Sequence, residues 1–179
     1  MAEPPTSAGV VTAEELLCLN LPDKQTERVR GRLIGHQHGL VALEIARLIA
    51  NHARDHYQGI AVAAETGLKL FSKPDTVRAA DVAFIGRARV PDPPPTGYLA
   101  LAPDLAVEVL SPNDRAGDVQ GKVSDWLTAG SRLVWVIDPV RRRALVYRAD
   151  GSVALLGERD TLDGEDVLPG FGCPLDSLW

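Results

Sequence analysis

The sequence predicts a single α/β domain in which amphipathic helices pack against one central β-sheet. The strongest observation is residues 104–110, DLAVEVL, a nearly continuous apolar run of strand length. Such runs are typical of a central strand that is covered on both faces. A helical pattern follows at 114–130, and a second apolar strand pattern, SRLVWVIDP, occupies 131–139. A strand, a helix and another buried strand in this order indicate a central sheet with helices on its faces.

The first part of the chain predicts a tail, one strand and one long helix. Residues 1–11 are rich in Pro, Ala, Ser and Gly, so we expect a flexible tail there, followed by a single domain over 12–179. Residues 27–34 suit a strand better than a helix. Residues 38–56 predict an amphipathic helix, because large apolar side chains recur at helical spacing. These side chains are Leu40, Leu43, Ile45, Leu48 and Ile49.

Short strands account for most of the remaining chain. We expect them at 60–65, 67–71 and 80–85, before a Pro-rich loop at 90–98. Residues 142–157 predict a hairpin whose turn is Asp150-Gly151. The C-terminal stretch LPGFGCPLDSLW predicts an irregular apolar cover. In the helix at 114–130, one apolar stripe contains Val119, Val123, Trp126 and Leu127.

The composition is that of an ordinary globular protein. The chain has 179 residues, of which 45% are hydrophobic, enough for a proper core. Its formal net charge of −5 argues against a protein that coats nucleic acid, although an enzyme can touch DNA through a local basic patch. Cys18 and Cys173 form no CxxC pair, so we expect no structural zinc or disulfide framework and a cytoplasmic location. We also expect neither a signal peptide nor a membrane-spanning segment.

Two carboxylates stand out within the predicted strands. Because side chains alternate along a strand, Glu108 shares one face of 104–110 with Asp104 and with the small Ala106. A buried carboxylate needs a partner, a proton or a metal. Asp81 lies at the start of the strand pattern 80–85 and would converge with Glu108 if the two strands are neighbours. Paired carboxylates suit Mg²⁺ or Mn²⁺, which keep several waters that a substrate can displace.

Lys122 follows Glu108 on the predicted helix, at the edge of its apolar stripe. Its ammonium group can reach toward the sheet, where it would steady a phosphate oxygen or orient an attacking water. Asp, Glu, Lys and a divalent cation together suit phosphodiester hydrolysis. Two plainer interpretations remain open: Glu108 pairs with Lys122 or an Arg purely as structure, or Lys122 pairs with Asp118 on the helix surface.

Other chemistries have less support in the sequence. Arg141, Arg142 and Arg143 form a basic run that is either a solvated turn or a contact for the DNA backbone. His36 and His38 lack a clear third ligand, so they are weak support for a zinc site. No GxSxG, GxGxxG or GxxxxGK pattern is present, so neither a nucleophilic serine elbow nor a nucleotide-binding loop is indicated.

Several segments together resemble the Uma family of endonucleases, which belongs to the PD-(D/E)XK, or restriction-endonuclease-like, superfamily. The resemblance extends from about Thr12 to the C-terminus. It implies a restriction-endonuclease-like α/β core with a central mixed sheet flanked by helices, magnesium dependence, cleavage of DNA and a homodimer. The segments that carry it are VTAEELLCL, VRAADVAFI, APDLAVEVLSPNDRAGDVQGK, DWLTAGSRLVWVIDP and LPGFGCPLDSLW.

The resemblance assigns roles to individual residues. Asp81 matches the acid of the family's "PD" box and Glu108 the acid of its "EV" strand, so both are expected metal ligands and catalytic residues. The lysine that the wider superfamily carries two residues after its second acid is absent, since Leu110 stands there. Lys122 on the next helix is expected to replace it. Glu65 matches an acidic or polar position and is a candidate auxiliary ligand.

The rim of the site is less well matched. Glu27 would match the acid of the family's N-terminal strand, and His38, or else His36, the histidine that begins the long helix. Asp104 belongs to the family's "PDL". It is expected either to support the metal ligands from behind or to mark the start of the strand. Ala80 stands where the family's "PD" pair has Pro. With the displaced lysine and the acidic net charge, this change keeps an alternative open: a catalytically inactive nuclease fold that serves as a binding or assembly module.

Overall fold

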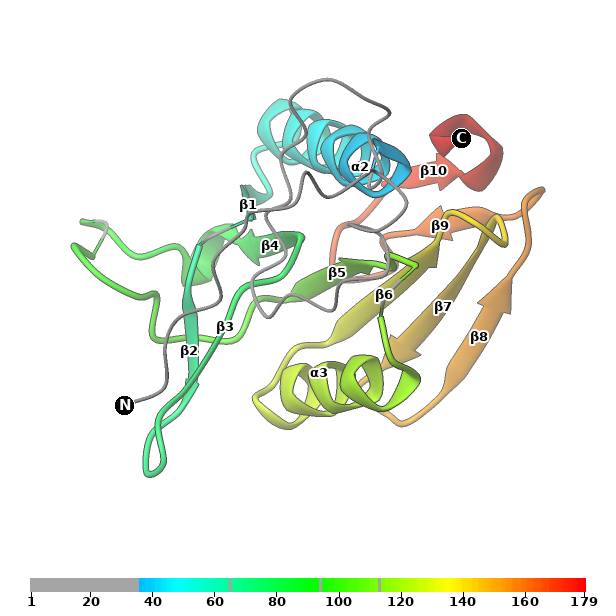
Figure 1. Cartoon of the computed structure of the whole chain (residues 1–179). Coiled ribbons are helices and arrows are strands. Elements are labelled where there is room, and N and C mark those ends of the chain that lie inside the picture. Colours follow the sequence, from blue (N-terminus) through cyan, green and yellow to red (C-terminus); the bar gives the residue numbers. More distant parts are fainter. Residues whose placement is uncertain (1–35, 65, 94, 113) are drawn as a thin grey trace, which may run out of the picture. The chain divides into compact units, whose positions relative to one another are not determined.

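In the part of the chain that the structure describes, a six-stranded mixed sheet forms the centre, with strand order β1-β4-β5-β6-β7-β8 (Figure 1). This computed structural model describes residues 36–64, 66–93, 95–112 and 114–179, and Gln37–Trp179 form one compact unit. The strands of the sheet are β1 (Gly59–Ala63), β4 (Val82–Gly86), β5 (Leu105–Val109), β6 (Leu133–Asp138), β7 (Arg143–Arg148) and β8 (Val153–Leu156).

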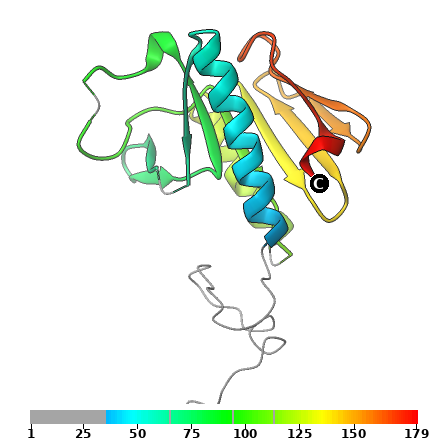
Figure 2. The same cartoon turned by 90° about the horizontal axis from the view of Figure 1, so that it is seen from above.

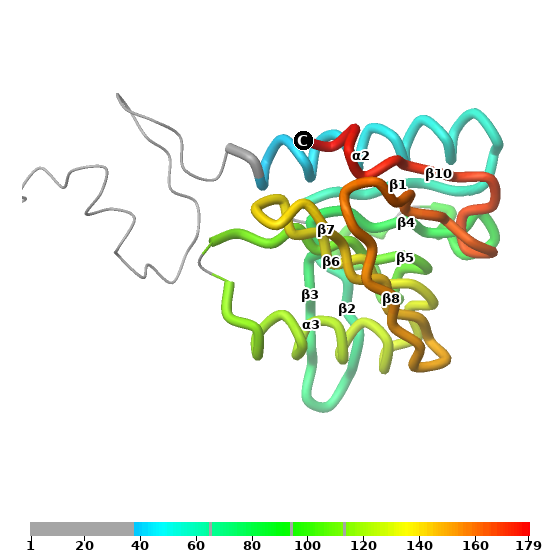
Figure 3. The backbone as a smooth tube through the Cα atoms, turned by 90° about the vertical axis from the view of Figure 1, so that its right-hand side faces the viewer, coloured from blue at the N-terminus to red at the C-terminus, as the bar shows by residue number. Residues whose placement is uncertain are grey.

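The helices α2 (His36–Asp55) and α3 (Ala116–Thr128) cover opposite faces of the sheet (Figures 2 and 3). β5 and β6 run parallel, and the other neighbouring strands of the sheet run antiparallel. Because parallel strands need a crossover, α3 connects the end of β5 to the start of β6. The predicted strand–helix–strand unit is confirmed.

Alternation along β5 divides the interior into two apolar clusters. Leu105, Val107 and Val109 belong to the cluster beneath α2, whereas Ala106 belongs to the cluster beneath α3. All five residues of β5 are buried, as the uninterrupted apolar run predicts. Glu108 therefore lies on the α3 face, in the interior of the protein.

The buried stripe of α2 differs in part from the predicted one. Leu40 and Leu43 are 51% and 68% exposed, so their assignment to an apolar face was wrong. The helix packs on the sheet through residues four apart, which lie one above another on a single face. The fully packed side chains of this stripe are Val41, Ile45, Ile49 and Ala53.

Several short elements complete the described chain. β2 (Leu68–Phe71) and β3 (Thr76–Arg78) form a separate hairpin, of which the sequence predicted only β2. The β7–β8 hairpin turns at Asp150-Gly151 as predicted; Gly151 has φ +85°, and the Asp150 carboxylate accepts a hydrogen bond from the Ser152 amide. The remaining elements are the strands β9 (Thr161–Asp163) and β10 (Gly172–Pro174) and the 3₁₀ turns η1 (Arg87–Arg89) and η2 (Leu175–Leu178).

The C-terminal cover is present but more regular than predicted. β10 pairs with β9, and Phe171, Cys173 and Leu175 pack into the cluster beneath α2. The tail at 1–11, the strand at 27–34 and the start of the domain at 12 lie outside the described residues, so they stay predictions. None of the helices in the described part of the chain is long and apolar enough to cross a membrane.

The corrected face of α2 gives a direct test by core truncation. Ile45→Ala should lower the free energy of unfolding by about 2–5 kcal/mol, because it leaves a cavity at a side chain that is 0% exposed. Leu43→Ala should change it by less than about 0.5 kcal/mol, since that side chain is mostly in water. Urea unfolding followed by circular dichroism measures both variants. Equal losses would contradict this orientation of the helix.

Candidate active site

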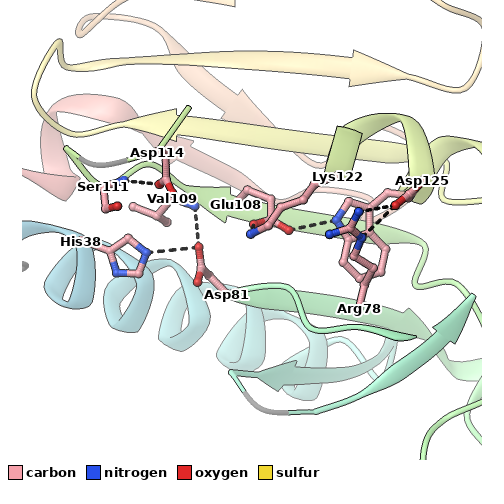
Figure 4. Close-up of polar contacts among 10 residues, drawn as sticks. His38, Arg78, Asp81, Glu108, Val109, Ser111, Asp114, Lys122 and Asp125 are labelled. Carbon is pink, nitrogen blue, oxygen red and sulfur yellow. Dashed lines mark hydrogen bonds and ion pairs between the residues drawn. The ribbon is translucent and has the colours of Figure 1, made fainter. Parts of the chain in front are cut away.

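The pairing of β4 with β5 brings Asp81 and Glu108 together. Val82 pairs with Val107, so one further step along the antiparallel register sets Asp81 opposite Glu108. Side chains directly opposite each other on neighbouring strands have Cβ atoms about 4.5–5.5 Å apart. The charge of Asp81 also contributes to raising the pKa of Glu108, which is consistent with this proximity. Figure 4 shows both carboxylates at one edge of the sheet, between α2 and α3.

Glu108 is a buried carboxylate held by two donors from α3. Only 3% of the residue is exposed. Lys122 Nζ donates to Oε2 at 2.6 Å, and Trp126 Nε1 donates to Oε1 at 2.9 Å. Burial raises the pKa of Glu108 above its ordinary value, and the opposing effects of Lys122 and Trp126 do not fully offset it. The charged form of this carboxylate is therefore disfavoured, even with both donors in place.

Lys122 carries the matching positive charge and stays partly in contact with water. Its side chain is 38% exposed, against 4% for Glu108. Burial lowers the pKa of Lys122, but the charges of Glu108, Asp81 and Asp114 outweigh burial, and the net pKa is raised. The pKa of Glu108 and that of Lys122 are both raised, because the carboxylate is buried more deeply than the ammonium group and loses more of its contact with water. Lys122 pairs with Glu108 rather than with Asp118.

Asp81 is anchored through one of its two carboxylate oxygens. The amide of Val109 donates to Oδ2 at 2.7 Å, and His38 Nε2 lies 3.4 Å from the same oxygen. The hydrogen bond to Asp81 is the main cause that raises the pKa of His38, and burial works against it. The side chain of Asp81 is 24% exposed, so solvent reaches this carboxylate. The first turn of α2 thus brings His38 to Asp81, and its role in the site stays a prediction.

Three further side chains lie around these groups and were missed by sequence reasoning. Asp114 accepts a hydrogen bond from the Ser111 amide at 2.7 Å, and its charge raises the pKa of both His38 and Lys122. Arg78, at the end of β3, forms an ion pair with Asp125 of α3 (Figure 4). The SPND sequence, which favours an Asx turn, is a signal for Asp114. No comparable local signal marks the Arg78–Asp125 pair.

Asp104 lies at the other end of β5 from Glu108. Its carboxylate accepts hydrogen bonds from the Gly86 amide at 2.8 Å and from Arg89 at 2.7 Å. The two acids are four steps apart along the strand, or about 13 Å at 3.3 Å per residue. Asp104 therefore fastens the start of β5 to the end of β4 and does not join the cluster around Glu108.

The arginine run forms the turn between β6 and β7. Arg141 and Arg143 both contact the buried carboxylate of Asp138, and Arg142 pairs with Glu158. β5 and β6 are parallel, so their C-terminal ends lie at the same end of the sheet. The arginine turn follows β6 and therefore lies at the end of the sheet near Glu108. The arginines, together with part of β8, line an open groove of about 470 Å³.

Glu27 and Glu65 lie outside the described residues, as does the side chain of His36. Among the described residues, no group of three or more His, Cys, Asp and Glu side chains is arranged to hold a metal ion. Two carboxylates nevertheless fit Mg²⁺, which typically takes one or two protein carboxylates and completes its shell with waters and phosphate oxygens. A cation beside Glu108 would offset the effect of burial on this carboxylate. An all-oxygen pair does not suit structural zinc.

The unequal burial of the ion pair predicts unequal effects of its two halves. In metal-free buffer that contains EDTA, Lys122→Met should lower the free energy of unfolding by about 1–2 kcal/mol, because it leaves a buried carboxylate unpaired. Glu108→Gln should cost less, since the released ammonium group can reach water. The loss in Lys122→Met should grow as the pH rises through the raised pKa of Glu108, where the folded protein must hold the ion.

Denaturant unfolding of both single variants and the double variant measures this coupling. Glu108→Gln should remove most of the loss that Lys122→Met causes. Additive effects in the double variant would show that the two side chains do not stabilise each other.

A crystal structure titled as a "putative nuclease belonging to DUF820" from Anabaena variabilis is similar in fold, with a TM-score of 0.73 at 18% identity over 92% of this chain and 95% of that chain. No curated protein matches. The sequence profile of the Uma2 family, described as "Putative restriction endonuclease", matches residues 13–176. The chain therefore belongs to the Uma2 family of restriction-endonuclease-like proteins.

Proposed function

We propose that this protein is a Mg²⁺-dependent endonuclease that hydrolyses phosphodiester bonds in DNA. The observation that carries the proposal is the meeting of Asp81 and Glu108 at one sheet edge, with the Lys122 ammonium group on Glu108. Family membership and the similar fold of a nuclease support the broader assignment.

Each group in the cluster has a distinct role in this proposal. Asp81 and Glu108 would hold the ion, which when bound lowers the pKa of a coordinated water and stabilises charge that develops on the phosphate. Lys122 would place its charge against a phosphate oxygen or orient the attacking water, since its side chain is partly exposed. Trp126 fixes the orientation of Glu108, and His38 that of Asp81.

The turn between β6 and β7 is the proposed contact for the DNA backbone. Arg141, Arg142 and Arg143 contribute three positive charges, and their partners Asp138 and Glu158 two negative charges, which leaves one net positive charge. Since the whole chain carries −5, binding to DNA would depend on such local contacts. The turn follows the sheet edge of the candidate site, so a bound backbone can extend from one to the other.

Nicking of supercoiled plasmid tests the reaction. The wild-type protein should nick DNA with Mg²⁺ or Mn²⁺ and not in EDTA. Asp81→Asn, Glu108→Gln and Lys122→Met should each lower the rate by about 100-fold or more, because each removes charge that acts on the transition state. Asp118→Asn, an exposed acid on α3, is the matched control and should stay within about twofold of wild type.

Persistence of nicking in Lys122→Met would place the activity in another site or in a contaminating nuclease. A wild-type protein that binds DNA but does not nick it under any metal would favour the inactive binding module. Gel shifts of the same variants separate these two outcomes.

Metal binding has a readout that does not depend on catalysis. Mg²⁺ or Mn²⁺ should raise the melting temperature of the wild type and of Asp118→Asn, because the ion binds only the folded state. The same additions should not raise that of Glu108→Gln. Differential scanning fluorimetry over a metal titration measures the shift. An unchanged melting temperature in the wild type would contradict the proposed metal site.

A further inference from the structure

An ion pair between Arg78 and Asp125 joins β3 to α3 beside the candidate site (Figure 4). Arg78 donates through Nε at 2.8 Å and through Nη2 at 2.5 Å, and both hydrogen bonds reach Oδ2 of Asp125. The two side chains are 33% and 32% exposed. Ion pairs that contact water to this extent contribute little to overall stability. What this pair contributes follows instead from the two segments that it connects.

On α3, the pair holds the turn that supplies both donors to Glu108. Asp125 lies three residues after Lys122, and side chains three apart are neighbours on a helix surface. Trp126 comes directly after Asp125. Lys122 Nζ and Trp126 Nε1 donate to the two oxygens of Glu108. Any rotation of this turn therefore moves Asp125 together with both donors.

On the sheet, the pair holds the segment that carries Asp81. Arg78 ends β3, and Asp81 follows three residues later, just before β4. Between them, Ala80 is buried in the apolar cluster beneath α3. The Val109 amide fixes the Asp81 carboxylate. Because this segment is anchored at two places, Arg78 is a fixed point for the helix opposite it.

Side-chain contacts hold α3 on two sides. Packing on the apolar cluster beneath the helix is non-directional, so it does not by itself set the rotation of the helix. On the side of β7, Gln120 Nε2 donates to the Tyr147 hydroxyl at 2.9 Å. On the side of β3, Asp125 accepts from Arg78. The helix therefore cannot turn about its axis without breaking one of these contacts.

We propose that Arg78 is a positioning residue, which through Asp125 fixes the rotation of α3 and keeps the Lys122 ammonium group on Glu108. The consequence for turnover rests on the proposed nuclease function, whereas the position of Lys122 does not. Both N–H groups of Arg78 converge on one carboxylate oxygen, so the ammonium group of a lysine can replace them. Removal of either charge releases the helix on this side.

Chemical labelling of amines tests the position of Lys122 without any reaction on DNA. Acetic anhydride is added briefly, and mass spectrometry gives the labelling rate of Lys122 relative to that of the exposed Lys73. Arg78→Gln and Asp125→Asn should each raise this ratio several-fold, because an ammonium group released from its carboxylate spends more time in water. Arg78→Lys should keep the ratio of the wild type.

Arg148 and Glu165 provide a matched control. The side chains of their ion pair are 31% and 29% exposed, much like those of Arg78 and Asp125. Arg148 pairs with Leu133 at the start of β6, so it lies at the end of the sheet away from Glu108. Arg148→Gln should leave the labelling of Lys122 unchanged. Circular dichroism shows that each variant is folded.

Nicking kinetics with Mg²⁺ test the consequence for turnover. Arg78→Gln should lower kcat by about 10- to 100-fold with little change in KM, because a small displacement of a reacting group is costly. Arg78→Lys should recover most of the rate, and Arg148→Gln should stay within about twofold of wild type. The double variant Arg78→Gln/Asp125→Asn should be no slower than the slower single variant, since both changes remove the same contact.

Unchanged labelling of Lys122 in Arg78→Gln and Asp125→Asn would overturn the inference. An equal rise in Arg148→Gln would overturn it as well, since it would indicate a general loosening of the protein. A higher KM at unchanged kcat in Arg78→Gln would make Arg78 a contact for DNA instead, which also contradicts the positioning role. If the wild type does not nick DNA, only the proposed function fails, and the labelling decides the position of Lys122.

Discussion

Burial of the Glu108 carboxylate is the constraint on which the arrangement of the site depends. A buried anion is unfavourable unless cations or donors surround it, and this one is met by Lys122 and Trp126 from α3. The same contacts hold the helix on the sheet. Asp81 brings a second negative charge close to the first, which opposes the effect of Lys122. Two carboxylates this close together destabilise the folded protein unless a positive charge lies beside them.

The sequence was sufficient for the main elements and for the two central acids. Uninterrupted apolar runs identified β5 and β6, because a strand that is covered on both faces has no polar face to break the apolar run. The alternation of side chains assigned Glu108 to its face, but its meeting with Asp81 required β4 to be the neighbour of β5. Leu40 and Leu43 of α2 were wrongly assigned to the buried face. Two adjacent stripes of the helix contain enough apolar residues to form such a face, and the sequence alone does not distinguish them.

Other features could not be derived because they depend on tertiary approach. Trp126 reads as an apolar residue of the α3 stripe, and only the docked helix brings its indole N–H to Glu108. Arg78 and Asp125 are far apart in sequence and meet where β3 ends against α3.

The amine of the site is carried by a helix, whereas the acids belong to the sheet. Its position relative to Glu108 therefore follows how α3 rests on the residues beneath it, of which Val123 and Trp126 are buried. A change of volume in this part of the interior would tilt or slide the helix and move Lys122 by a fraction of its length. In the proposed enzyme, hydrophobic substitutions remote from solvent would thus adjust turnover gradually, without replacing any group of the site.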